Sequence, residues 1–285
     1  MDQRIIELFD RFTHGALSRR VFLDRLARVA GGSAAALALL PLLQNDYARA
    51  AIVPEDDERL TTTSVEFDAA GGPVAGYLAH LKGEAKRPGV IVIHENRGLN
   101  PHIRDVTRRF ALDGFLALAP DMLSPLGGTP DNEDTAREMF RSLDVAETVA
   151  RLAAVVAYLG GHPLSTGRVG AVGFCWGGGM ANRLAAAGTA LRASVAYYGL
   201  QLPADQVPKI TAPLLLHYAG LDERINAGVA VFEAALKANG KAYELFMYEG
   251  VNHAFNNDTS PTRYDKAAAD LAWGRTVEFL KTHLK

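Results

Sequence analysis

The sequence has almost none of the cysteine that disulfides and structural zinc sites require. Its 285 residues include a single cysteine, Cys175. One cysteine excludes an intrachain disulfide and every zinc site that needs two thiolates. A lone cysteine is therefore either an inert buried side chain or a chemically active group, and its sequence neighbours decide between the two.

An excess of charge of either sign is also lacking. Thirty basic and 32 acidic residues give a formal net charge of −2. Such a chain has no strong positive field to attract nucleic acid or an anionic membrane surface, so we expect neither partner. A hydrophobic content of 48% excludes a chain that is mainly disordered.

No hydrophobic run is long enough to cross a membrane. The best candidate, residues 29–43, is a weakly hydrophobic run rich in Ala, Gly and Leu. It has about fifteen residues, whereas a membrane-spanning helix needs roughly 20. We therefore expect no integral membrane span.

Residues 1–50 nevertheless have the pattern of an export signal. The stretch Ser18-Arg19-Arg20-Val21-Phe22-Leu23 precedes the hydrophobic run, and Ala48-Arg49-Ala50 gives a small-x-small cleavage pattern after it. Paired Arg followed by Phe-Leu resembles a twin-arginine signal. The sequence predicts a signal at residues 1–50, a folded domain at 51–285 and a periplasmic or exported protein. The alternative is an uncleaved N-terminal helix that packs on a cytoplasmic domain.

From residue 60 onward, short apolar runs alternate with helical patterns. Two β-rich runs flank residues 71–73 and predict an antiparallel hairpin. Six further runs are apolar on both faces, as expected for buried parallel strands, at residues 90–94, 115–119, 169–174, 193–198, 214–218 and 243–248. Helical patterns lie between or after them, at residues 102–113, 144–159, 176–187, 226–239 and 263–283. This alternation predicts an α/β fold with an eight-stranded, mostly parallel sheet and helices on both faces. Residues 120–134 are predicted to be a loop over the carboxyl edge of the sheet.

The cysteine stands where an apolar run meets a helical pattern. Gly173 and Gly177 flank Cys175 two residues before and two residues after it. This is the arrangement of a nucleophile elbow, with Cys in place of Ser, and the strained turn needs glycines at both positions. We predict that Cys175 is a nucleophile, that the following helix N-terminus favours its thiolate, and that the Trp176 N–H faces an oxyanion. The alternative is a small buried side chain at a strand end.

An acid and a base follow in the order nucleophile, acid, base. Asp222 comes directly after the strand at 214–218, where its carboxylate can reach over the sheet edge. Glu223 is a rival, although it stands nearer the following helix, and Asp222 could instead be a helix-capping acid. His253 is the only histidine between the last strand and the final helix, and it is the predicted base. The alternative is a loop histidine with no task.

Metal and cofactor signals are weak. His94, Glu95 and His102 form the only nearby cluster of ligand types in the sequence, and their spacing matches no metal motif. A dinucleotide-binding glycine fingerprint is missing after the early strands. We expect neither a metal nor a cofactor.

Residues 90–99, the segment from Gly173 to Gly178, Asp222 and His253-Ala254-Phe255 together resemble the dienelactone hydrolase family, or carboxymethylenebutenolidases. The resemblance covers about residues 60–285 and implies an α/β-hydrolase fold. It implies that Glu95 accepts the thiol proton in the resting enzyme, and that the Asn96 N–H is a second oxyanion donor. The alternative for Glu95 is a solvent-exposed loop acid.

The resemblance is weaker at the positions that recognise substrate. Family members that open dienelactones hold the substrate carboxylate with two arginines, and one of these positions is Asn257 here. Arg97, Arg104 and Arg137 are candidates to supply the missing charge. Asn offers neutral donors only, so the sequence predicts that neutral esters or lactones are handled at least as well as carboxylated ones.

These observations predict a hydrolase of small esters or lactones with a Cys175, His253 and Asp222 triad. The alternative is a non-catalytic α/β-hydrolase scaffold that binds a small hydrophobic ligand. An intact set of Cys, His and Asp favours the enzyme.

Overall fold

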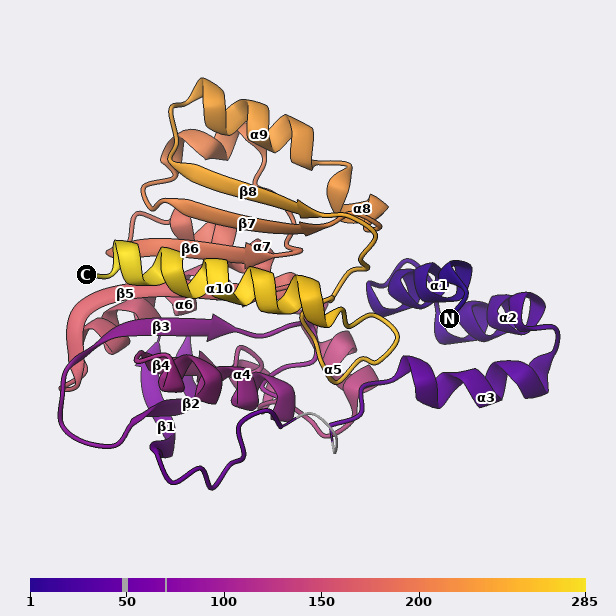
Figure 1. Ribbon diagram of the computed structural model, residues 1–285, viewed down its shortest axis with the longest axis horizontal. Coiled ribbons are helices and arrows are strands. Elements are labelled where there is room, and N and C mark those ends of the chain that lie inside the picture. The colour runs from indigo at the N-terminus through magenta and orange to yellow at the C-terminus, as the bar shows by residue number, and fades with distance from the viewer. Residues whose placement is uncertain (48–50, 70) are drawn as a thin grey trace.

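The computed structural model describes residues 1–47, 51–69 and 71–285, and its centre is an eight-stranded sheet (Figure 1). The strand order is β1-β2-β4-β3-β5-β6-β7-β8. The pairs β1–β2 and β2–β4 are antiparallel and all other neighbours are parallel. The strands are β1 Leu60–Ala69, β2 Gly72–Leu81, β3 Arg87–Ile93, β4 Leu116–Pro120, β5 Ser165–Phe174, β6 Leu191–Tyr197, β7 Leu214–Ala219 and β8 Tyr243–Tyr248. The predicted eight-stranded, mostly parallel sheet is confirmed.

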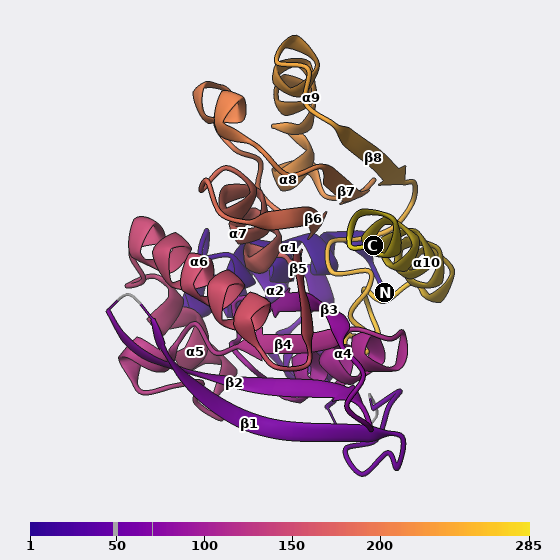
Figure 2. The same ribbon diagram turned by 90° about the vertical axis from the view of Figure 1, so that its left-hand side faces the viewer.

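Helices cover both faces of this sheet (Figure 2). On one face, helices α4 Pro101–Leu112 and α10 Lys266–His283 contribute to a core that includes Val90, Val92 and Val172. On the other face, α6 Val145–Gly161, α7 Trp176–Ala185 and α9 Val229–Ala238 pack on Ile91, Ile93 and neighbouring strand residues. The central strands are apolar throughout because both of their faces are buried.

The parallel strands all end at one edge of the sheet, and the loops that follow them meet there. Strand β3 leads to Glu95, β5 to Cys175, β7 to Asp222 and β8 to His253. Ligands of open α/β sheets bind outside the carboxyl ends of the strands. The topology therefore gathers the predicted site residues at a single edge.

Three N-terminal helices lie beyond this same edge (Figure 1). They are α1 Gln3–Thr13, α2 Arg19–Ala30 and α3 Ser33–Leu43, and they enclose a small apolar core of their own around Phe9, Phe22 and Leu26. Helices α2 and α3 meet at an angle of 110°. Within the described ranges no single helix is long and apolar enough to cross a membrane; only α2 and α3 taken together pass that test. The predicted cleavage pattern Ala48-Arg49-Ala50 falls outside the described residues.

Polar contacts tie the N-terminal helices to the main domain. The side-chain amide of Gln3 donates to Asn252 at 2.7 Å, and Arg224 pairs with Asp10 at 3.3 Å. The guanidinium of Arg137 lies 4.4 Å from the centre of the Phe12 ring. Residues 1–43 therefore pack against the edge of the sheet where the site is expected.

Two segments differ from the sequence prediction. Residues 120–134, predicted as a loop, contain the 3₁₀ helix η1 Ser124–Leu126 and lead into α5 Glu133–Phe140, which the sequence reading missed. The helix predicted at 226–239 is α9, which begins after its N-cap Gly228, and the short helix α8 Glu223–Asn226 before it was not predicted. A second 3₁₀ helix, η2, spans Ala204–Lys209. Short charged helices are missed because their stability comes from caps and tertiary contacts rather than from a long apolar stripe.

Candidate active site

Cys175 occupies a strained turn between β5 and α7. Its backbone has φ 55° and ψ −114°, a conformation that residues with a side chain rarely adopt. A Cβ built on Gly173 would lie 2.0 Å from the Gly177 carbonyl oxygen, and one on Gly177 would lie 2.2 Å from the Ile93 carbonyl oxygen. Both flanking glycines are therefore sterically required, and the predicted elbow geometry is confirmed.

His253 and Asp222 form a buried pair beside this turn. The His253 Nδ1 lies 2.5 Å from Asp222 Oδ2. Asp222 Oδ1 also accepts a hydrogen bond from the Ile225 N–H, so the same carboxylate caps α8 and orients the imidazole. Asp222 is therefore a helix-capping acid that also contacts His253, and its triad role stays a prediction. Glu223, the rival, is the first residue of α8 and is exposed.

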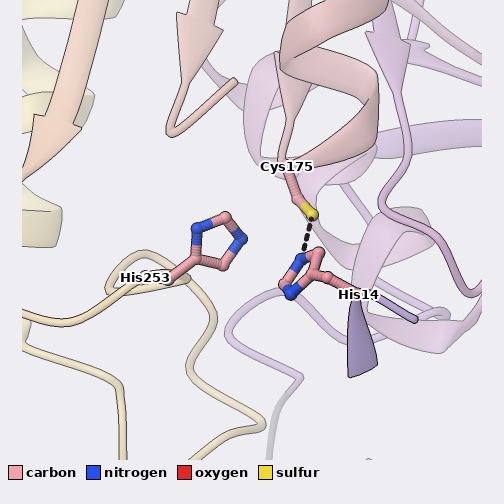
Figure 3. A group of neighbouring side chains, drawn as sticks. All are labelled: His14, Cys175 and His253. Carbon is pink, nitrogen blue, oxygen red and sulfur yellow. Dashed lines mark hydrogen bonds between the residues drawn. The ribbon is translucent and has the colours of Figure 1, made fainter. Parts of the chain in front are cut away.

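The sequence reading did not anticipate a second imidazole at the sulfur, which belongs to His14 (Figure 3). His14 caps the C-terminus of α1, and its Nε2 lies 3.2 Å from Cys175 Sγ. Its Nδ1 lies 2.8 Å from the Asp10 carbonyl oxygen and 3.1 Å from Asp10 Oδ1. The rings of His14 and His253 meet edge to face, with centroids 4.7 Å apart. Two imidazoles, each with an aspartate partner, therefore face one sulfur.

The electrostatics of this group favour a thiolate beside protonated imidazole. Burial opposes ionisation of the thiol, but His14 and His253 outweigh it and lower the pKa of Cys175 to about 6. Burial also disfavours the imidazolium of His253, yet Asp222 and Cys175 raise its pKa to about 10. The pKa of His14 is raised against burial by Cys175 and Asp10.

Glu95 is buried, and its carboxylate is hydrogen-bonded to Asn257 rather than to Cys175. Its Oε2 accepts a hydrogen bond from Asn257 Nδ2 at 2.9 Å, and no hydrogen bond joins it to Cys175 in the described parts of the chain. Burial raises its pKa, but the charges of His102 and Arg97 outweigh burial and lower it. Glu95 is therefore a buried carboxylate rather than a solvent-exposed loop acid. The thiol-proton role that the family resemblance implies for it stays a prediction.

The two residues predicted to donate to the oxyanion, Trp176 and Asn96, both line the cavity that contains Cys175. Trp176 is the first residue of α7, so its N–H has no partner within the helix. Asn96 lines the same cavity as Cys175, and its side chain donates to the Thr13 carbonyl oxygen at 2.9 Å. This contact also joins the β3 loop to the N-terminal segment. The oxyanion roles of Trp176 and Asn96 remain predictions.

A cavity of about 320 Å³ lies in front of the sulfur. Its apolar wall includes Phe140, Trp176, Met180 and Leu200, and His14 and His253 also line it. Four arginines reach it, which are Arg137, Arg141, Arg183 and Arg224. A second cavity of about 520 Å³ reaches His253 from the other side of α1. The N-terminal segment therefore forms part of the walls around the site.

The candidate substrate-binding residues are scattered. Arg137 lines the cavity and is paired with Asp134. Arg97 is buried against Glu133 at 2.9 Å.

Two other candidates lie away from the cavity lining. Arg104 lies over the Tyr77 ring, with its guanidinium carbon 5.1 Å from the centroid. Asn257 does not line the cavity, and its amide group bonds to Glu95 and Thr259. Of the four candidates, the structure thus brings only Arg137 to the sulfur-side cavity.

His14, Cys175 and His253 also have the composition of a metal-binding group. Their ligand atoms lie within 4.8 Å of one another, and no other trio of His, Cys, Asp or Glu among the described residues is grouped in this way. The sequence analysis did not foresee this group, because His14 lies 161 residues before Cys175 in the chain. The one available signal was the Asp10 and His14 spacing of four residues on a helix, which brings two side chains to one face.

Tyr198 is a further buried residue of the site that sequence reasoning missed. It follows β6 with φ 39°, and its ring lies 4.8 Å from the His253 ring. Its hydroxyl has no hydrogen-bond partner among the described residues. Strained backbone of this kind clusters at functional sites.

Comparisons with known proteins identify the family of the chain. A family model described as "Dienelactone hydrolase family" matches residues 74–284, and one described as "YqhI-like" matches residues 1–32. An Escherichia coli O157:H7 protein named "Putative carboxymethylenebutenolidase" is 31% identical in an alignment 247 positions long, which covers 81% of this chain and 91% of the relative. A Bradyrhizobium protein named "Probable 2-oxo-3-(5-oxofuran-2-ylidene)propanoate lactonase" is 34% identical over 80% of this chain and 96% of its own.

A solved structure has the same fold. It is the crystal structure named "Putative Dienelactone Hydrolase" from Klebsiella pneumoniae, which superposes with a TM-score of 0.71 at 28% identity. The match covers 78% of this chain and 98% of the Klebsiella chain. The chain therefore belongs to the dienelactone hydrolase family and has the α/β-hydrolase fold.

Proposed function

We propose that this protein hydrolyses small esters or lactones with Cys175 as the nucleophile. The observation that carries the proposal is the strained elbow that presents the Cys175 sulfur beside the Asp222–His253 pair. A thiol at this position is set for covalent catalysis because an oriented imidazole stands next to it.

The proposed reaction has two stages. The thiolate attacks the carbonyl carbon, a C–S bond forms, and the C–O bond to the leaving alkoxide breaks as His253 Nε2–H protonates that oxygen. Water then attacks the thioester and gives a proton to His253, the C–S bond breaks, and the acid product leaves. The amides of Trp176 and Asn96 hold the oxyanion in both stages, and each such donor contributes about 3–4 kcal/mol in measured cases.

The test is turnover of a chromogenic short-chain ester and a simple lactone by the wild type, Cys175→Ala and His283→Gln. His283 is exposed at the end of α10, so its substitution is the matched control. We expect Cys175→Ala to lose at least about a thousandfold in kcat/KM, as removal of a triad member does, while the control keeps full activity. Mass spectrometry of the wild type during turnover should detect an acyl group on Cys175.

Two outcomes would contradict the proposal. Activity of Cys175→Ala within tenfold of wild type would exclude the sulfur as nucleophile. A wild type that binds small hydrophobic esters but turns none over would support the non-catalytic scaffold instead.

We also propose that residues 1–50 direct export through the twin-arginine route. Arg19 and Arg20 stand in the first turn of α2 and both are exposed, which supports their recognition by an export receptor. Substitution of both by Lys should retain the protein in the cytoplasm. Periplasmic recovery of the doubly substituted chain at the wild-type level would refute this.

A further inference from the structure

We propose that Asp10 and His14 form a second imidazole–carboxylate pair for Cys175, so that the N-terminal segment is part of the active site in the full-length chain. In this arrangement His14 holds the resting thiolate and His253 is free to serve the leaving group and water. The inference rests on Cys175 being the reactive group, as proposed above. It does not depend on which substrate the enzyme hydrolyses.

The surroundings of His14 resemble those of His253. The Nδ1 of His14 is hydrogen-bonded to the main-chain carbonyl oxygen of Asp10 at 2.8 Å and makes an ion-pair contact with the Asp10 carboxylate at 3.1 Å. The Nδ1 of His253 is hydrogen-bonded to the Asp222 carboxylate at 2.5 Å, and a ring nitrogen of each histidine lies within 4.8 Å of Sγ. An aspartate at Nδ1 fixes the ring orientation and stabilises its protonated form. The Nε2 of His14 makes the hydrogen bond to Sγ, whereas the buried Nε2 of His253 has no hydrogen-bond partner among the described residues (Figure 3).

His14 is held in place from several sides. Its side chain and that of Asp10 are each only 13% exposed. Arg224 pairs with Asp10 from α8, and Asn96 binds the carbonyl oxygen of Thr13, the residue before His14. A chance contact of a mobile terminus would not be fixed by bonds to both a helix and a loop of the main domain.

Glu95 does not stand at the sulfur in this structure. Its carboxylate accepts from Asn257, so the group next to Sγ is the imidazole of His14. When the thiol ionises, its proton passes to His14 Nε2, the S–H bond breaks and an N–H bond forms. The resulting imidazolium donates hydrogen bonds to the thiolate and to Asp10.

Other ionisable groups surround this pair and also influence the pH dependence of Cys175 alkylation. Those that interact with Asp10, His14 or Cys175 from the elements packed around them are His253, Arg224, Arg263, Arg97 and Tyr198. The variant at position 14 is therefore compared with a variant at His253, and with one at Glu95, the residue to which the family resemblance assigns the thiol proton.

The test is the rate of Cys175 alkylation by iodoacetamide from pH 5 to 10 in the full-length protein, in the presence of EDTA. Wild type, His14→Gln, Asp10→Asn, Glu95→Gln and His253→Gln are compared, with His283→Gln as the control. We expect His14→Gln to move the midpoint upward by at least one pH unit and to slow alkylation at pH 5 about tenfold, since below both midpoints one pKa unit is a tenfold change in ionisation. The rate at pH 10, where the thiol ionises unaided, should match wild type and so rules out a change in access.

Asp10→Asn keeps the imidazole and should shift the midpoint in the same direction by a smaller amount. It carries the test if His14→Gln does not fold, which circular dichroism would reveal. His253→Gln should lose ester turnover yet keep rapid alkylation at pH 7, because His14 still holds the thiolate.

Superimposable profiles for His14→Gln and wild type would overturn the inference. So would a shifted midpoint in Glu95→Gln together with an unshifted one in His14→Gln, since the thiol proton would then reside on Glu95. If His14→Gln shifts the midpoint but wild type hydrolyses no ester or lactone, the second pair stands and the proposed function fails.

Discussion

At the scale of single residues, the ionisation of Cys175 and His253 sets the pH range in which the site can work. The pKa of the thiol is lowered to about 6 against burial, by His14 first and then by His253, and the pKa of His253 is raised to about 10, by Asp222 first and then by Cys175. The attacking thiolate forms as pH rises through the first value. The imidazolium that protonates the leaving group is lost as pH rises through the second.

We therefore expect kcat/KM for a neutral ester to rise through pH 6, to stay level, and to fall near pH 10. The measurement is an initial-rate profile with a substrate that does not itself titrate. If kcat/KM instead rises only near pH 9, the ordinary pKa of a thiol, the two imidazoles do not activate the sulfur.

At the scale of an element, the turn between β5 and α7 is the most constrained backbone of the site. We expect Gly177→Ala to lower the free energy of unfolding by at least about 3 kcal/mol, because the added Cβ would lie 2.2 Å from a carbonyl oxygen of β3 that cannot move aside. For a chain of this size the melting temperature should fall by about 6–12 °C.

The control for that substitution is Gly274→Ala in α10. This glycine is exposed and has open space where a Cβ would be added, so alanine should raise helix stability slightly. Equal melting temperatures for the two variants would show that the elbow has more room than its contacts indicate.

Two functions are proposed for the N-terminal helices, which are export and activation of the Cys175 thiol. Cleavage after export would end the second function. Residues 1–50 include both the paired arginines and His14, so cleavage after Ala50 would remove His14 from the site. We expect a processed periplasmic form to show the alkylation midpoint of His14→Gln, and the full-length form to show the lower wild-type midpoint. Intact mass identifies each form. A processed form with the wild-type midpoint would mean that His14 is not what activates the thiol.

At the scale of the whole molecule, local patterns predicted the sheet and the residues that follow its strands. Continuous apolar runs located the buried strands because both of their faces are covered, and the spacing of Gly173, Cys175 and Gly177 predicted the strained turn from steric need alone. Asp222 and His253 followed from the order of loops along one sheet edge. These are features that a few neighbouring residues determine.

The sequence could not reveal contacts between distant segments. His14 reaches Cys175 across 161 residues, and only the packing of α1 on the sheet edge brings them together. Asn257 is a predicted substrate-binding residue with neutral donors, yet its amide group binds the buried Glu95. Whether a side chain faces a cavity or a neighbour depends on tertiary packing, which residue spacing in a loop does not record.

The charge preference of the substrate depends on the cavity as a whole. Two arginines of the cavity wall form ion pairs, Arg137 with Asp134 and Arg224 with Asp10. Arg183 also lines the cavity, and no carboxylate in the described structure lies within ion-pair distance of it. The Arg183 guanidinium donates to the Gly179 carbonyl oxygen at 3.2 Å. A half-buried guanidinium without a carboxylate partner can pair with a substrate carboxylate. This arginine could supply the charge that Asn257 lacks, so it bears directly on the expected preference for neutral substrates.

We expect Arg183→Gln to lower kcat/KM for a carboxylated dienelactone about tenfold or more, because a charge-assisted contact is lost, and to leave the methyl ester of that lactone unchanged. Arg192→Gln, on the exposed start of β6, is the matched control. If wild type handles the methyl ester as well as the acid and Arg183→Gln alters neither, the cavity does not read charge and the preference expected from Asn257 holds. If the acid is favoured and Arg183→Gln removes the advantage, Arg183 recognises the carboxylate that the Asn257 position does not.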